Sequence, residues 1–143
     1  MADTLRKTIL EQFYKTISDA NYFSYVKDSR LLPQNFGLAH LPACFIYVEN
    51  ENKILGGNEA VIGKETWELN IVTEMFARES DIDTTINTTH KAIMSDNTLQ
   101  TMIGLLDAIS IEYYAFVAER DIIGVAITWR MLYRHKYGDM TSD

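Results

Sequence analysis

The chain has few of the residues that cross-link a fold or interrupt its helices and strands. Its 143 residues include one cysteine, two prolines and seven glycines. A lone cysteine excludes an intramolecular disulfide. Cys44 lies in the apolar run 43–48, where a buried structural thiol is expected rather than a nucleophile. So little proline and glycine argues against a long disordered linker. We therefore predict one ordered, soluble domain over residues 1–143, in a reducing compartment.

Long hydrophobic runs and an excess of basic residues are also missing. Nowhere do about 18 uncharged apolar residues follow one another, and the first residues lead into an amphipathic pattern instead of an apolar signal core. Neither membrane insertion nor secretion is predicted. Thirteen basic residues stand against twenty acidic ones, which gives a formal charge of −7. Non-specific binding to nucleic acid relies on Lys and Arg to neutralise phosphates, so a net charge of this sign opposes it.

Local signatures of catalysis and metal binding are absent too. The segment 57–65 fails as a P-loop, because its glycines are one residue too far apart and Glu65 stands where Ser or Thr would ligate magnesium. His40, His90 and His135 have no second ligand at metal spacing, and His90 is expected in the core or at an interface. We predict no enzymatic activity, no cofactor and no metal. Catalytic triads assemble in space, so a small-molecule enzyme or ligand-binding domain stays an alternative.

Apolar periodicity predicts the helices. Apolar residues recur every three or four positions from about Thr4 to Ser18 and from Asp81 to Met94, and a short further helix is expected around Leu99–Leu106. Asp3 is expected to cap the first helix. The segment 80–83 has the spacing of a capping box for the second.

Alternating patterns predict the strands. They lie at about Tyr22–Val26, at Ala43–Glu49 and from Lys64 onward, and the runs 109–117 and 123–133 predict a long C-terminal hairpin. The polar segment from Glu49 to Gly63 predicts a long loop that is mobile in the free subunit. The predicted fold class is α+β, with an antiparallel sheet that carries the N-terminal helix and the central helix pair.

Two local features indicate docking surfaces. The chain has two Trp, eight Tyr and six Phe; core packing explains most of them, and Tyr114 and Phe116 are candidate interface anchors. A strand period of two places Arg130, Arg134 and Lys136 on one face, where they could pair with an acidic surface on a neighbouring subunit. A solvated strand end that keeps an edge soluble is the alternative.

Four segments of the second half follow one another in an informative order. They are the strand 66–72, the helix around His90, the turn Asp96-Asn97-Thr98-Leu99 and the closing strand 124–135, which contains Tyr133-Arg134. In this order they resemble the tail terminator proteins of long-tailed bacteriophages, in which an Asp-x-Thr-Leu turn leads into a hairpin whose long last strand ends in Tyr-Arg and a polar tail. The resemblance covers about residues 64–137.

This resemblance implies a small α+β subunit without catalytic residues. Such subunits form rings, usually homohexamers, that cap the finished tail tube, stop its polymerisation and provide the surface on which neck proteins dock. The implied partners are copies of itself, a tail tube protein, a neck or head-completion protein and, in a contractile tail, a sheath protein. The implied location is the tail or neck of the virion, assembled in the host cytoplasm. A negative lumen would let the genome pass without sticking. Another neck, head-tail connector or tail tube protein is the alternative.

Overall fold

The computed structural model describes residues 4–29, 32, 36–54, 63–115, 121–136, 138 and 140. Their elements, in chain order, are α1 (Leu5–Asp19), β1 (Tyr25–Lys27), the 3-10 turn η1 (Leu38–His40), β2 (Ala43–Ile54), β3 (Lys64–Arg78), the 3-10 turn η2 (Glu79–Asp81), α3 (Ile82–Met94), α4 (Asn97–Met102), β4 (Leu105–Ala115) and β5 (Ile122–Lys136).

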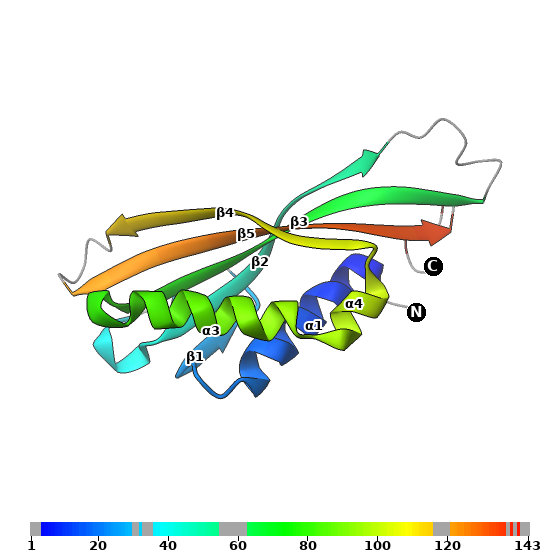
Figure 1. Cartoon of the computed structure of the whole chain (residues 1–143). Coiled ribbons are helices and arrows are strands. Elements are labelled where there is room, and N and C mark those ends of the chain that lie inside the picture. The colour runs from blue at the N-terminus through cyan, green and yellow to red at the C-terminus, as the bar shows by residue number, and fades with distance from the viewer. Residues whose placement is uncertain are drawn as a thin grey trace.

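The strands form one sheet in the order β1-β2-β3-β5-β4. The short strand β1 runs parallel to β2, and every other neighbouring pair is antiparallel. Helices α1, α3 and α4 lie together on one side of this sheet, as Figure 1 shows. The α+β class, the helices packed on the sheet and the closing hairpin β4–β5 are therefore confirmed, and β1 makes the sheet mixed.

The main core lies between the sheet and the helix layer. Odd-numbered residues of β3 and β5 point into it, and Leu69, Ile71, Val125 and Ile127 are fully buried there. A second, smaller apolar cluster on the opposite, open face contains Ala43, Phe45, Phe76 and Ile122, against which Tyr25, Phe36 and Leu41 pack. The strands therefore bury apolar side chains on both faces of the sheet, because the segment before β2 covers one end of the open face.

Strand β2 corrects the predicted loop. Residues from Asn50 to Ile54 pair antiparallel with the first half of β3, after an irregularity between Val48 and Asn50. The expectation of a loop is therefore wrong for residues 49–54, because a long partner strand supplies backbone hydrogen bonds regardless of how polar the side chains are. Residues 55–62 lie outside the described part of the chain, as does most of the P-loop-like segment.

The helix starts also differ from their predictions. Thr4 is the N-cap of α1, and its Oγ1 accepts a hydrogen bond from the Lys7 backbone N–H at 3.2 Å; Asp3 lies outside the described residues. Asp81 makes no side-chain cap bond to α3, because η2 precedes the helix and leaves Asp81 in the αR region instead of the extended conformation of a cap. The last predicted helix ends at Met102, and Leu106 belongs to β4. No helix within the described residues is long and apolar enough to span a membrane.

Candidate assembly surfaces

The residues expected to be chemically inert are held in the core or against it. Cys44 is fully buried. Burial, and to a lesser extent Glu74, raises the pKa of its thiol, so it does not supply a thiolate. His90 on α3 is exposed on one side and stacks on Trp129, with ring centroids 5.7 Å apart. In the part of the chain that the structure describes, no three His, Cys, Asp or Glu residues could hold a metal ion together.

The end of β5 places three basic residues on the open face. Arg130, Arg134 and Lys136 occupy even positions, which alternate with the buried odd positions of the strand. Arg130 forms an ion pair with Glu68, with 3.1 Å between Nε and Oε2. Arg134 and Lys136 are exposed, and no carboxylate among the described residues pairs with either one. His135 lies on the opposite face, fully buried.

Tyr114 is engaged within the sheet. It lies on the open face, where its ring packs edge-on against Phe76 with centroids 6.1 Å apart and covers Gly124. Its hydroxyl donates a hydrogen bond to Glu74. Tyr114 therefore fastens β4 to β5 and β3, and 37% of it stays exposed. The other predicted aromatic anchor, Phe116, lies outside the described residues.

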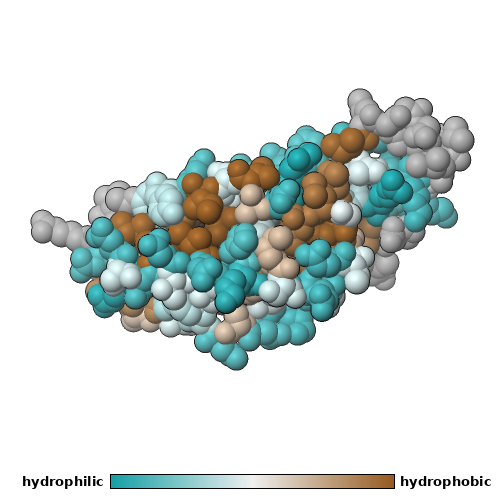
Figure 2. Space-filling model, in the orientation of Figure 1, coloured by the Kyte–Doolittle hydropathy of each residue, from teal (hydrophilic) through white to brown (hydrophobic). Residues whose placement is uncertain are grey.

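An apolar row on β4 is the most exposed hydrophobic surface of the described chain. It consists of Ile109, Ile111 and Tyr113, which are 52%, 44% and 59% exposed. Ile111 pairs with Ile127, and Tyr113 pairs with Val125, both of which point into the main core. Ile111 and Tyr113 thus belong to the helix-covered face of the sheet, at a place that the helices do not reach, and Ile109 precedes them at an irregularity between Ala108 and Ser110. Figure 2 shows apolar atoms along this part of the surface, beside α3.

β4 is also an edge strand. It pairs with β5 alone, so the backbone groups on its outer side have no strand partner among the described residues. Proteins usually protect such edges with charges or keep them short. Here the edge is 11 residues long. The exposed apolar row therefore lies on a long strand edge that no other strand pairs among the described residues.

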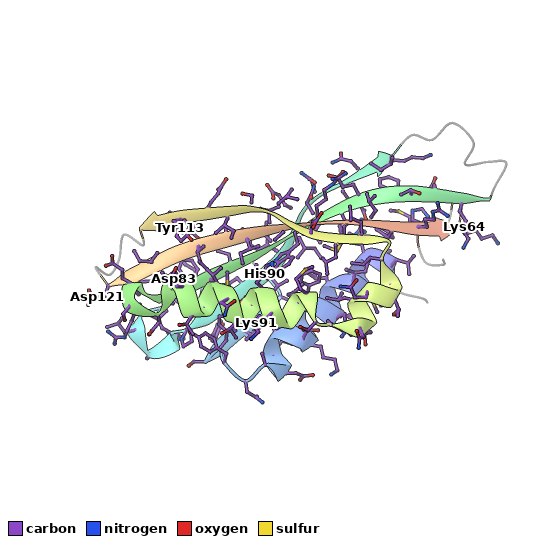
Figure 3. The ribbon with its side chains drawn as sticks, in the orientation of Figure 1. Lys64, Asp83, His90, Lys91, Tyr113 and Asp121 are labelled. Carbon is purple, nitrogen blue, oxygen red and sulfur yellow. The ribbon has the colours of Figure 1, made fainter. Side chains whose placement is uncertain are left out.

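Sequence reasoning missed this row for a definite reason. The alternation of the run 109–117 predicts a strand of the C-terminal hairpin, and it does not decide which side of that strand is exposed. Periodicity identifies which residues share a face, but it does not reveal that the strand lies at the edge of the sheet. In Figure 3, Tyr113 lies on β4 on the same side of the sheet as α3, which carries Asp83 and His90.

A polar cluster holds the far end of the sheet together on its helix side. Glu65 accepts a hydrogen bond from the Trp67 indole N–H at 3.1 Å and pairs with Lys53 at 3.2 Å. His135 Nε2 lies 3.3 Å from the same carboxylate. The hydrogen bond from Trp67 lowers the pKa of Glu65, a smaller effect of burial opposes this, and Lys53 adds to the lowering. The cluster joins β2, β3 and β5, so its role is structural.

No protein-family model matches the chain, and no curated protein matches it. One similar solved structure is described as the virion of a native gene transfer agent particle. It has 9% sequence identity and a TM-score of 0.45, over 92% of this chain and 95% of that chain. At this TM-score the likeness assigns neither a family nor a function.

Proposed function

We propose that the chain is a structural virion protein, a tail terminator that forms a ring, caps the tail tube, stops its polymerisation and offers a docking surface to neck proteins. The observation that best supports this is the apolar row of Ile109, Ile111 and Tyr113 on the free edge of β4. A subunit that is assembled in a ring buries such a surface against its neighbour, whereas a permanent monomer leaves the surface exposed to water.

The order of elements agrees with the resemblance found in the sequence. Segment 66–72 lies on β3, His90 on α3 and the closing segment on β5. Asp96 of the Asp-x-Thr-Leu turn caps α4 through hydrogen bonds from the backbone N–H groups of Thr98 and Leu99, at 2.9 and 3.2 Å. The turn therefore has a local structural role that explains why these residue types stand there. A structural role of this kind needs no enzymatic activity, and we propose none.

Tube length tests the terminator function directly. Particles produced without this protein should carry tail tubes of unregulated length, and supplying the protein in trans should restore one uniform length. Electron microscopy of the particles measures this. Tubes of normal length that fail to join heads would instead identify another neck or connector protein, and would contradict the terminator proposal.

The role of β4 is tested by matched tyrosine variants. Tyr113→Ser removes the most exposed member of the row, and it should abolish ring formation while the folded subunit persists. Tyr14→Ser is the control, because Tyr14 is an exposed tyrosine of α1 and lies outside the row. Native mass spectrometry gives the copy number of each variant. Equal ring formation by both variants would show that β4 is not part of the interface.

A further inference from the structure

The open face of the sheet carries an acidic hollow. Glu49, Glu74 and Glu112 surround it, and the small side chains of Ala126 and Thr128 line it. The strand register places Glu74 and Glu112 on either side of Ala126. Because neighbouring strands are about 4.8 Å apart, their Cα atoms lie about 10 Å from each other. The hollow thus presents carboxylates from three strands. Larger side chains complete its lining: Tyr47, Val72 and Tyr114.

Two of these carboxylates are uncompensated. Glu49 and Glu112 are exposed, and neither forms an ion pair or a hydrogen bond within the described residues. Glu74 accepts the hydrogen bond from the Tyr114 hydroxyl. Three like charges around one hollow repel one another, so the hollow gains from any cation that enters it. Its sign also disfavours phosphate groups.

The same face carries the opposite charge at its far end. We call Arg134 and Lys136 the basic tip, since both are exposed at the end of β5 and have no carboxylate partner among the described residues. Arg134 lies six positions beyond Thr128, which corresponds to about 20 Å along an extended strand. This distance is too long for the tip to neutralise the hollow of its own copy.

We propose that the basic tip of one copy docks in the acidic hollow of a second copy. The inference rests on the proposed function and deepens it, because it names the two surfaces that meet. Arg134 can bind carboxylates through two parallel N–H donors, and its guanidinium loses hydration more readily than an ammonium group does. Each copy offers one tip and one hollow, so successive copies can join head-to-tail, and the assembly closes into a ring when the rotation allows.

A second copy is the occupant that the charges favour. A nucleic acid would place phosphates against the carboxylates of the hollow, which Coulomb repulsion opposes. A metal ion needs converging ligands at bonding distance, and among residues 63–115 and the other described segments no such group exists. The tip supplies two cations on one strand, and these complement the two uncompensated carboxylates Glu49 and Glu112.

Charge reversal tests the contact. The tip variant is Arg134→Glu with Lys136→Glu, and the hollow variant is Glu49→Lys with Glu112→Lys. Arg130 and Glu74 are left unchanged, because each already has a partner within the chain. Each double variant alone should lose the ring. An equal mixture of the two, or a single chain with all four changes, should recover it.

The control is Lys27→Glu with Lys91→Glu, which changes the net charge as the tip variant does but alters exposed positions of β1 and α3. It should assemble as the unaltered chain does. Mass photometry at 0.15 M and 1 M salt measures the assembly state of each variant, of the mixture and of the control. The ring should weaken at high salt, where charges are screened beyond about 3 Å.

The outcomes separate this inference from the proposed function. Normal rings from the tip variant would overturn the docking contact while leaving the terminator proposal intact. Two-fold dimers from the mixture, instead of larger rings, would overturn the head-to-tail arrangement. If the unaltered chain forms no ring, immobilised tip variant should still bind the hollow variant and reject a second tip variant. Failure of that binding would overturn the inference independently.

Discussion

Tyr114 and Gly124 form a matched pair across β4 and β5. A Cβ built on Gly124 would lie 2.3 Å from Cε2 of Tyr114, so an alanine forces the ring to move. The ring lies at the sheet edge and can swing toward solvent, hence Gly124→Ala should cost about 1–3 kcal/mol of unfolding free energy. Urea unfolding measures this cost. In a Tyr114→Ala background the same change should cost little, and an equal cost in both backgrounds would contradict the contact.

Trp129 and Thr73 join β5 to β3 at the centre of the core. Both residues are fully buried, and the indole N–H donates to Thr73 Oγ1 at 3.0 Å. Thr73→Val removes the acceptor and leaves a buried donor unsatisfied, so it should destabilise the fold by about 1–3 kcal/mol. With Trp129→Phe already present, Thr73→Val should cost much less. Additive losses in denaturant titrations would show that the hydrogen bond contributes nothing.

At the scale of elements, Asp96 holds two helices in place. Its carboxylate caps α4 and also accepts hydrogen bonds from Thr16 and Gln12 of α1. Burial raises the pKa of Asp96, but these hydrogen bonds and those from the backbone N–H groups of Thr98 and Leu99 outweigh it and lower the pKa below its ordinary value.

The pH dependence of Asp96→Ala follows from that direction. Because the pKa is lower in the folded state, the carboxylate contributes stability above its unfolded pKa of about 3.9, and this contribution is lost as pH falls through the folded pKa. Asp96→Ala should therefore cost about 1–2 kcal/mol at pH 7 and progressively less below about pH 4. Thermal unfolding across this range checks it. A difference that is constant with pH would exclude the carboxylate charge as the cause.

The elements differ in how far the sequence predicted them. The long strands and α3 are confirmed, because a sustained period of two or 3.6 is set by burial of one face. The second half of β2 was not predicted, since Glu49–Ile54 is polar and only its pairing with β3 makes it a strand. Likewise the period of two placed Arg130, Arg134 and Lys136 on one face of their strand. The acidic hollow could not be predicted in this way, because it combines residues of four strands and depends on how those strands pair.

At the scale of the whole molecule, the net negative charge opposes binding to nucleic acid. The formal charge is −7, and Arg134 and Lys136, which have no carboxylate partner among the described residues, are proposed to bind a neighbouring copy. We therefore expect no measurable binding to duplex DNA at 0.15 M salt with protein at tens of micromolar. Fluorescence anisotropy of a labelled duplex tests this. Micromolar binding that weakens steeply with salt would show that the basic tip contacts phosphates instead of carboxylates.

In the proposed function, the chain assembles into a closed ring through its own surfaces. Native mass spectrometry of the purified chain at tens of micromolar, with chelator present, measures this most directly, and class averages from electron microscopy show whether the assembly closes. We predict a closed ring of about six copies that needs neither metal nor nucleotide. A chain that stays monomeric at every concentration, both alone and in the presence of tail tube ends, would contradict the claim.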